Sequence, residues 1–281
     1  MNHFFQPDPF QRVTHLLASI GVALLLCACA TTRNESVTGQ NSAPVDDVSL
    51  ASQSGQAAPQ IAHKFSNWQH FTLPGKQPNT YRAVKLDNRD AMQVHSEASV
   101  SLFRQKVRVP PNELGHIKFS WKVPQLIAKA DMAVRELSDS PVRIVLAFDG
   151  DRSRLSVKNA MLSELTHSIT GEPMPYATLM YVWCNQCKRE GVIPNSRTDR
   201  IQKLAVETGS KNLNHWQDYE RDIRADFKLA FGEAPGALIG IAIMTDTDNT
   251  RGTANAWYGK VELIPSSSPP APATDLTSSA K

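Results

Sequence analysis

One stretch near the C-terminus constrains the fold more than any other. Leu238–Met244 is a continuous apolar run, a polar cluster from Thr245 to Thr250 follows it, and a second apolar segment, Ala256–Ile264, comes after Gly252. Apolar runs bounded by polar, glycine-marked turns are typical of buried strands. The pattern predicts a strand, a loop at one rim of a sheet, and a return strand.

The polar cluster is the candidate ligand site of the chain. Because alternate side chains of an extended chain share a face, Asp246 and Asp248 should point one way, and Thr245, Thr247 and Asn249 the other. The oxygens of Asp246, Asp248 and Asn249 suit the vicinal hydroxyls of a sugar. They equally suit a turn closed by bonds to its own backbone. We predict no metal, because calcium needs six to eight oxygens and only three are suggested locally.

Strand signals dominate residues 61–264. Runs rich in β-branched and aromatic residues, separated by Pro, Gly, Asn and Asp, predict eight strands: Tyr81–Leu86, Ala98–Val109, His116–Val123, Val142–Phe148, Ala177–Cys184, Arg200–Thr208, Leu238–Thr245 and Ala256–Ile264. Eight such strands predict a mainly β fold, a jelly-roll-like antiparallel β-sandwich.

Two short helices interrupt the strands. Helical spacing predicts Leu155–Ile169 and Arg224–Phe231, each followed by glycine and proline, and Trp216–Ile223 fits either strand or helix. The first helix collects its large apolar side chains on one side: Leu155, Met161, Leu162, Leu165 and Ile169.

The N-terminus has the layout of a secretory signal. Val13–Leu26 is almost wholly apolar, follows Arg12, and is too short to span a bilayer, which takes about 20 residues. The sequence Leu26-Cys27-Ala28-Cys29 resembles the lipobox of bacterial lipoproteins, and this resemblance implies cleavage before Cys29 and lipidation of its thiol. A plain cleaved signal with an incidental cysteine is the alternative. We expect anchoring by acyl chains in the bacterial cell envelope, on the periplasmic face of the outer membrane.

Polar tails flank the folded unit. Residues 29–60 and 265–281 contain hardly any large apolar residues, so both are predicted to be disordered. The predicted organisation of the chain is a lipoprotein signal peptide (1–28), a disordered tether (29–60), a β-sandwich domain (61–264) and a disordered tail (265–281). The net charge of +3 over 281 residues, with no Lys/Arg block, gives no support for nucleic-acid binding.

Several motifs of the folded unit resemble one bacterial family. These are Pro175–Trp183, Asp226-Phe227, Phe231-Gly232, the string Met244–Thr250, and Trp257-Tyr258-Gly259. They resemble a domain of unknown function, the family DUF3047, and the string Met244–Thr250 is the most specific part of the match. The resemblance implies a jelly-roll sandwich related to carbohydrate-binding modules, and it implies no catalytic residue.

Aromatic residues supply the second part of the predicted ligand site. We place Trp257, Tyr258, Trp183 and Tyr181 there with Asp246, because such side chains stack on sugar faces. Packing in the core is the alternative for each of them.

Cys184 and Cys187 are predicted to form a local disulfide, since the protein is expected to be exported. Three residues of extended strand span about 10 Å, more than the roughly 4.4–6.8 Å between bridged Cα atoms. The strand should therefore end near Trp183, with a turn at Asn185-Gln186.

These features predict a lipid-anchored binding module for a polysaccharide or another glycan, with no cofactor and unknown protein partners. A non-catalytic envelope scaffold lipoprotein is the first alternative. The second is a glycoside hydrolase, which needs two carboxylates about 5–9.5 Å apart; the carboxylates considered for it are Asp149, Asp151, Glu207, Asp226, Asp246 and Asp248. No serine-hydrolase, zinc-protease or nucleotide-binding motif is present, so we assign no catalytic residue.

Overall fold

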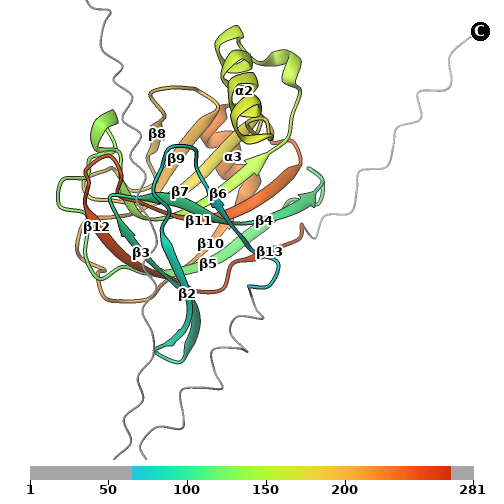
Figure 1. The fold of residues 1–281 in the computed structure, drawn as a ribbon. Helices are drawn as coiled ribbons and strands as arrows, with labels where there is room; N and C mark the ends of the chain where they lie inside the picture. Colours follow the sequence, from blue (N-terminus) through green and yellow to red (C-terminus); the bar gives the residue numbers. More distant parts are fainter. Residues whose placement is uncertain (1–64, 267–281) are drawn as a thin grey trace, which may run out of the picture. The chain divides into compact units, whose positions relative to one another are not determined.

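The computed structural model describes residues 65–266 (Figure 1). The predicted signal peptide, the lipidation site Cys29, the tether and residues 267–281 of the predicted tail lie outside the described residues. No helix among the described residues is long and apolar enough to cross a membrane.

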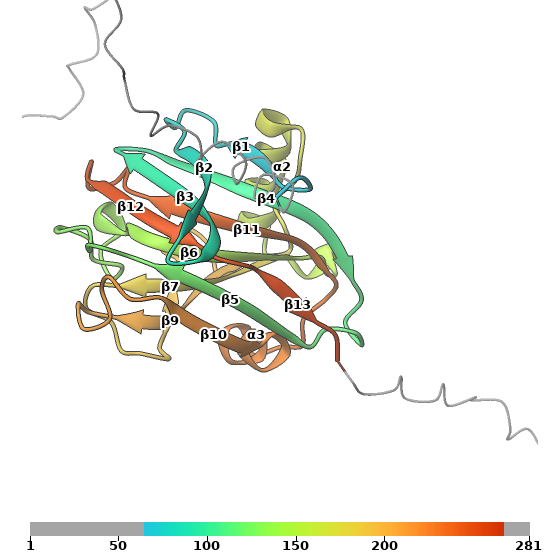
Figure 2. The same ribbon diagram turned by 90° about the horizontal axis from the view of Figure 1, so that it is seen from below.

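Two sheets pack face to face (Figure 2). The first has seven strands in the order β1(Gln69–Thr72), β4(Val100–Val109), β11(Leu238–Asp246), β6(Ser140–Phe148), β7(Ala177–Cys184), β9(Ile201–Thr208) and β8(Val192–Pro194). The second has six strands: β10(Gln217–Asp222), β5(His116–Lys122), β12(Thr253–Tyr258), β3(Arg89–Glu97) and β2(Thr80–Leu86) in that order, and β13(Glu262–Ile264) beside β5. Paired strands are antiparallel except β7 and β9, which run parallel. The predicted mainly β, jelly-roll-like sandwich is confirmed.

The core lies between the sheets. Its largest fully buried side chains are aromatic: Trp121, Trp183, Tyr181, Tyr258, Phe148 and Phe227. Large buried apolar side chains each contribute about 1.5–3 kcal/mol to folding, so these rings account for much of the force that holds the sheets together.

Two α-helices among the described residues confirm the predicted pair. Helix α2 (Val157–Thr170) is capped by Ser156, whose hydroxyl accepts from the Asn159 amide, and ends at Gly171 with φ of 76°. Helix α3 (Ile223–Phe231) is capped by the Asp222 carboxylate, ends at Gly232 with φ of 73°, and lies beside β10 in Figure 2. Both glycines take the left-handed conformation that closes a helix at low steric cost.

The apolar side of α2 faces solvent. The buried residues of this helix are Asn159 and Ser163. Its exposed residues include a stripe of large apolar side chains that are 57–79% exposed: Val157, Met161, Leu165 and Ile169. Figure 1 shows why, since α2 projects from one end of the sandwich.

Some strands differ from the sequence prediction. The predicted strand Ala256–Ile264 is two strands, because the chain leaves the ladder after Tyr258, and β13 resumes pairing with β5 at Glu262. At the break the Gly259 amide donates to the Ser120 carbonyl. The segment Trp216–Ile223 is mainly strand β10. Strands β1, β3 and β8 were not predicted, and β10 was left open between strand and helix.

Candidate functional site

The predicted polar cluster forms where β11 leaves the seven-stranded sheet. Thr245 and Thr247 are fully buried, while Asp246 and Asp248 meet on the other side of the strand. The predicted alternation holds for the two threonines and the two aspartates, but Asn249, which was expected on the threonine side, contacts Asp139 of the aspartate cluster. One carboxylate oxygen each from Asp139, Asp246 and Asp248 lie within 4.8 Å of one another.

Asp139 holds the loop after β11 in place. It is 1% exposed and accepts from the amide and side-chain nitrogens of Asn249 at 3.3 and 3.0 Å, and from the amide and hydroxyl of Thr250 at 2.8 and 2.6 Å. Asn249 therefore shapes a turn, the alternative considered for it from the sequence.

Two cations neutralise the remaining carboxylates. The Arg143 guanidinium pairs with Asp246 at 2.8 Å, and Lys76 pairs with Asp248. The pKa of Asp246 is raised to about 7. Burial is the main cause and the bond to Asp248 adds to it, while the positive charge of Arg143 opposes both. Burial also acts to raise the pKa of Asp248, but its bonds to Lys76 and Asp246 outweigh that and lower it. Asp248 is therefore the more acidic of the two carboxyl groups, since the pKa of Asp246 is raised and that of Asp248 is lowered.

This cluster offers few free oxygens to a metal ion. Calcium takes six to eight oxygen ligands, whereas both oxygens of Asp139 already accept two donors each, and Asp246 and Asp248 are paired with cations. The residues are an ion-pair network that ties the loop to the sheet.

Three of the four predicted aromatic residues belong to the core. Tyr181, Trp183 and Tyr258 have no exposed surface. The Tyr258 hydroxyl donates to the Met244 carbonyl at 2.6 Å, so even its polar end is engaged. Trp257 is half-buried, and its strand neighbours are Gln93 and Lys122 on the outer face of the six-stranded sheet.

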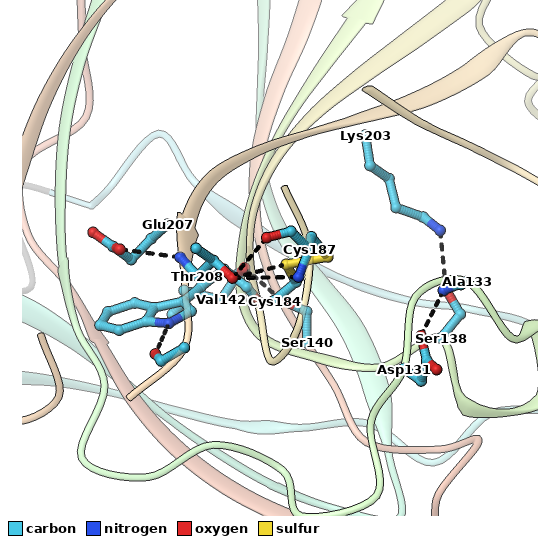
Figure 3. The surroundings of a disulfide bond; sticks show 12 residues. Asp131, Ala133, Ser138, Ser140, Val142, Cys184, Cys187, Lys203, Glu207 and Thr208 are labelled. Atoms are coloured by element: carbon cyan, nitrogen blue, oxygen red, sulfur yellow. Dashed lines mark hydrogen bonds between the residues drawn. A yellow bond between two sulfur atoms is a disulfide. The ribbon is translucent and has the colours of Figure 1, made fainter. Parts of the chain in front are cut away.

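The predicted disulfide between Cys184 and Cys187 is present (Figure 3). The Cα atoms of the two cysteines are 6.0 Å apart. Strand β7 ends at Cys184, as its predicted bounds do, and one residue beyond the end near Trp183 that the disulfide argument favoured. The Thr208 hydroxyl on the neighbouring strand β9 accepts from the Cys187 amide at 3.3 Å, so the staple is fixed to the sheet.

A concavity in the described part of the chain lies elsewhere. It has a volume of about 940 Å³ and is associated mainly with the six-stranded sheet, where β12 gives way to β13. Half-buried aromatic side chains, Trp68 and Tyr219, contribute to its wall. The other lining residues are Phe65, Arg89, Asp90, Gln105, Lys118, Phe119, Ser120, Asp218, Glu220, Gly259, Lys260, Val261 and Glu262.

The turn between β2 and β3 lies next to this cavity, since Arg89 and Asp90, which follow the turn, line the cavity wall. Asp87 and Asn88 both have positive φ, 51° and 61°, as a tight hairpin turn requires. The Asp87 carboxylate accepts from Lys122 at 2.7 Å and from the Trp216 indole at 3.1 Å, so the hairpin tip reaches across to β5 and to the start of β10. None of Asp246, Asp248, Asn249, Trp257 and Tyr258 lines the cavity.

Sequence reasoning missed several residues of both sites. In the network these are Asp139, Arg143 and Lys76, and in the cavity Trp68 and Tyr219. Arg143 had a detectable signal, since it is a single cation inside the apolar run Val142–Phe148. Trp68 had none, because it precedes the first predicted strand.

Comparison with known proteins gives one family. The family described as "Protein of unknown function (DUF3047)" matches residues 66–262. No match was found among curated proteins.

Several solved structures share the architecture at low identity. The xyloglucanase domain of NopAA, a type three effector from Sinorhizobium fredii, in complex with cellobiose, is 9% identical, with a TM-score of 0.38 over 71% of this chain and 93% of that one. The endoglucanase Cel12A from Rhodothermus marinus is 9% identical, with a TM-score of 0.39 over 71% and 92%. A loop-swap mutant of Xyn11A from Necallimastix patriciarum is 8% identical, with a TM-score of 0.32 over 70% and 100%. Likeness at this level does not carry an activity from one chain to another.

Proposed function

The chain belongs to the DUF3047 family, and we propose that it is a glycan-binding module held at the cell envelope by a lipid anchor. The observation that carries the binding function is the cavity of about 940 Å³, which combines aromatic walls with a polar rim. Ligand sites are concave, largely preformed, and lined by apolar surface with a few polar groups that fix orientation.

The aromatic side chains of the cavity suit a sugar ring. Trp68 and Tyr219 are half-buried, so each keeps part of its ring accessible while the rest is fixed by packing. Trp68 stacks on Phe103 with ring centroids 5.9 Å apart, and Tyr219 stacks on Phe119 at 5.2 Å. Such fixed aromatic surfaces bind the apolar faces of sugars, while neighbouring amide and carboxylate groups bind the hydroxyls.

The charged groups at the rim favour a neutral ligand. Three pairs bridge neighbouring positions: Arg89 with Asp218 at 2.6 Å, Lys118 with Glu220 at 3.3 Å, and Lys260 with Glu262 at 2.8 Å. These pairs cancel one another's charge, so the rim presents hydrogen-bonding groups without a strong field of one sign. A neutral polysaccharide segment meets that requirement better than an ionic ligand.

We place the ligand in the cavity and not at the network of Asp246 and Asp248. The carboxylates of the network are buried and paired with cations or with donors of the loop, and one oxygen, Asp246 Oδ1, has no partner among the described residues. The cavity, in contrast, is open. Trp257 extends the proposed binding surface for a longer glycan, because it lies on the outer face of the six-stranded sheet, two residues before Gly259 of the cavity wall.

The anchoring part of the proposal rests on the lipobox-like sequence ending at Cys29. Lipidation there would hold the domain on a membrane of the envelope through a tether of about 30 residues, whose r.m.s. reach is on the order of 30 Å. Replacing Cys29 by serine should move the protein from the membrane fraction to the soluble fraction. An unchanged membrane fraction would rule out anchoring at Cys29.

Titration calorimetry with a panel of neutral oligosaccharides tests the binding function. The lipid-free chain that starts at residue 30 should bind at least one of them, and Trp68→Ala should weaken that binding at least tenfold, equivalent to about 1.4 kcal/mol. Phe71→Ala is the matched control, because Phe71 is a half-buried aromatic residue outside the cavity and should leave affinity unchanged. Absence of binding across the panel, or equal affinity for Trp68→Ala and the parent, would refute the proposal.

A further inference from the structure

A buried lysine on the outer face of the seven-stranded sheet is unexplained by the glycan site. Lys203 lies on β9 and is 4% exposed, as is Arg143 on β6. Among the described residues, no carboxylate lies within ion-pair distance of Lys203. Burying an ammonium group without a counter-ion is unfavourable, so the position needs a reason.

The contact that Lys203 makes is with a serine hydroxyl. Its Nζ donates to Ser138 Oγ at 2.9 Å (Figure 3). Ser138 follows the short 3-10 helix Arg135–Leu137, in the loop that crosses this face of the sheet, and it keeps part of its surface exposed. Ser138 is therefore nearer the surface than the buried lysine behind it.

The surroundings of Lys203 favour its neutral form. The pKa of Lys203 is lowered to about 8. Burial is the main cause and the positive charge of Arg143 adds to it, while Asp246 on β11 opposes both. A neutral amine that is hydrogen-bonded to a hydroxyl can remove its proton, which is how a lysine activates a serine nucleophile.

We propose that Ser138 and Lys203 form a nucleophile and general-base pair that hydrolyses esters with a short acyl group. The substrate class follows from access, because only the Ser138 end of the pair reaches solvent. A small acyl ester can approach that hydroxyl, whereas a bulky one would meet the surrounding loop.

Arg143 supplies the third group that such a reaction needs. Its Nη2 donates to the Ser138 carbonyl at 2.7 Å, which holds the guanidinium next to the serine. Its buried Nε has no acceptor among the described residues. The guanidinium therefore lies beside the Ser138 backbone, where its positive charge favours the negative charge that develops on the ester oxygen.

The reaction is balanced without any co-reactant except water. Ser138 Oγ bonds to the ester carbonyl carbon as its proton moves to Lys203 Nζ. The bond between that carbon and the alkoxy oxygen then breaks, and the alkoxy oxygen takes the proton from Lys203. Water, deprotonated by Lys203, attacks the acyl-serine, and this releases the carboxylic acid and restores both residues.

Labelling of the full chain with an alkyl fluorophosphonate tests the pair. The probe bonds to an activated serine oxygen with loss of fluoride, and mass spectrometry locates it. The labelled peptide should contain Ser138, and the rate should rise with pH and level off above about pH 8 as Lys203 loses its proton. Hydrolysis of p-nitrophenyl acetate should follow the same pH profile.

The variants separate catalysis from a structural role. Ser138→Ala should abolish labelling, and Lys203→Met should slow it about 10²–10⁴-fold, the usual contribution of a general base. Ser168→Ala, which removes an exposed helix hydroxyl, should label as the parent does. If Lys203→Met does not fold, the pH profile of the unmodified protein still decides.

Three outcomes would overturn the pair. They are no labelling of the parent at pH 9, equal labelling of the parent and Ser138→Ala, and a labelling rate without an inflection near pH 8. In each of these cases Lys203 only ties the loop of Ser138 to the sheet.

Discussion

Replacement of Asp139 by alanine should destabilise the domain by about 3–6 kcal/mol. Asp139 is 1% exposed and accepts four hydrogen bonds, two from Asn249 and two from Thr250. Asn249 is exposed, so its donors can turn to water after the substitution. Thr250 is half-buried, and each of its two hydrogen bonds to the charged carboxylate is worth about 1.5–3 kcal/mol. The loss of these two bonds gives the predicted destabilisation.

The isosteric variant makes the reasoning sharper. Asp139→Asn keeps the volume but replaces one acceptor oxygen by an NH₂ group, which faces a backbone or side-chain donor of the loop. We therefore expect Asp139→Asn to recover at most half of the lost stability. If only volume mattered, this variant would be close to the parent.

Urea unfolding followed by tryptophan fluorescence measures the effect, because Trp121 and Trp183 are fully buried. The midpoint should fall with the m-value unchanged. Asp151→Ala is the control, since the Asp151 carboxylate also accepts from a backbone amide, that of Ser153 at 3.0 Å, but is exposed. A loss below about 1 kcal/mol for Asp139→Ala would refute the claim that this residue holds the loop.

Three further predictions concern the same sandwich. Because the folded-state pKa of Asp246 is raised to about 7, its contribution to stability is present below about pH 4 and is lost as the pH rises through 7. The difference in unfolding free energy between the parent and Asp246→Asn should therefore change between pH 5 and pH 8, and a constant difference would contradict the raised pKa of Asp246. Tyr258→Phe should cost about 1–3 kcal/mol in urea unfolding, since it removes the buried donor to the Met244 carbonyl; an unchanged midpoint would show that this bond contributes nothing. The double variant Cys184→Ser, Cys187→Ser should lose about 2 kcal/mol, because the disulfide closes a loop of only about four residues, and a loss above about 4 kcal/mol would mean that the staple does more than restrict the unfolded chain.

The fold was largely predictable because most strands are buried on at least one face. β7 matches its prediction residue for residue, and the apolar residues Ile117, Phe119 and Trp121 of β5 are all buried. Strands β3 and β10 were harder to predict from the sequence, because Arg89–Glu97 and Gln217–Asp222 are rich in charged and polar residues. Their pairing is set by neighbouring strands and not by a local apolar pattern.

The site was less predictable than the fold. Local sequence placed Asp246 and Asp248 together, because alternation along one strand fixes that relation. It could not bring in Asp139 or Arg143, which are more than 100 residues away along the chain and meet the cluster only through the pairing of β6 with β11. Burial of Tyr181 and Trp183 likewise depends on the second sheet, so their sequence alone left core and surface roles open.

The order of strands in the two sheets has a consequence for how the chain is made. β11 lies between β4 and β6, and β12 between β3 and β5, so an inner strand of each sheet is among the last to be synthesised. A nascent chain that stops before Leu238 lacks the partners of four earlier strands, and neither sheet can close. Contacts between such distant segments form slowly, typically in milliseconds to seconds for all-β domains. Neither sheet is therefore completed until synthesis of the chain is nearly finished.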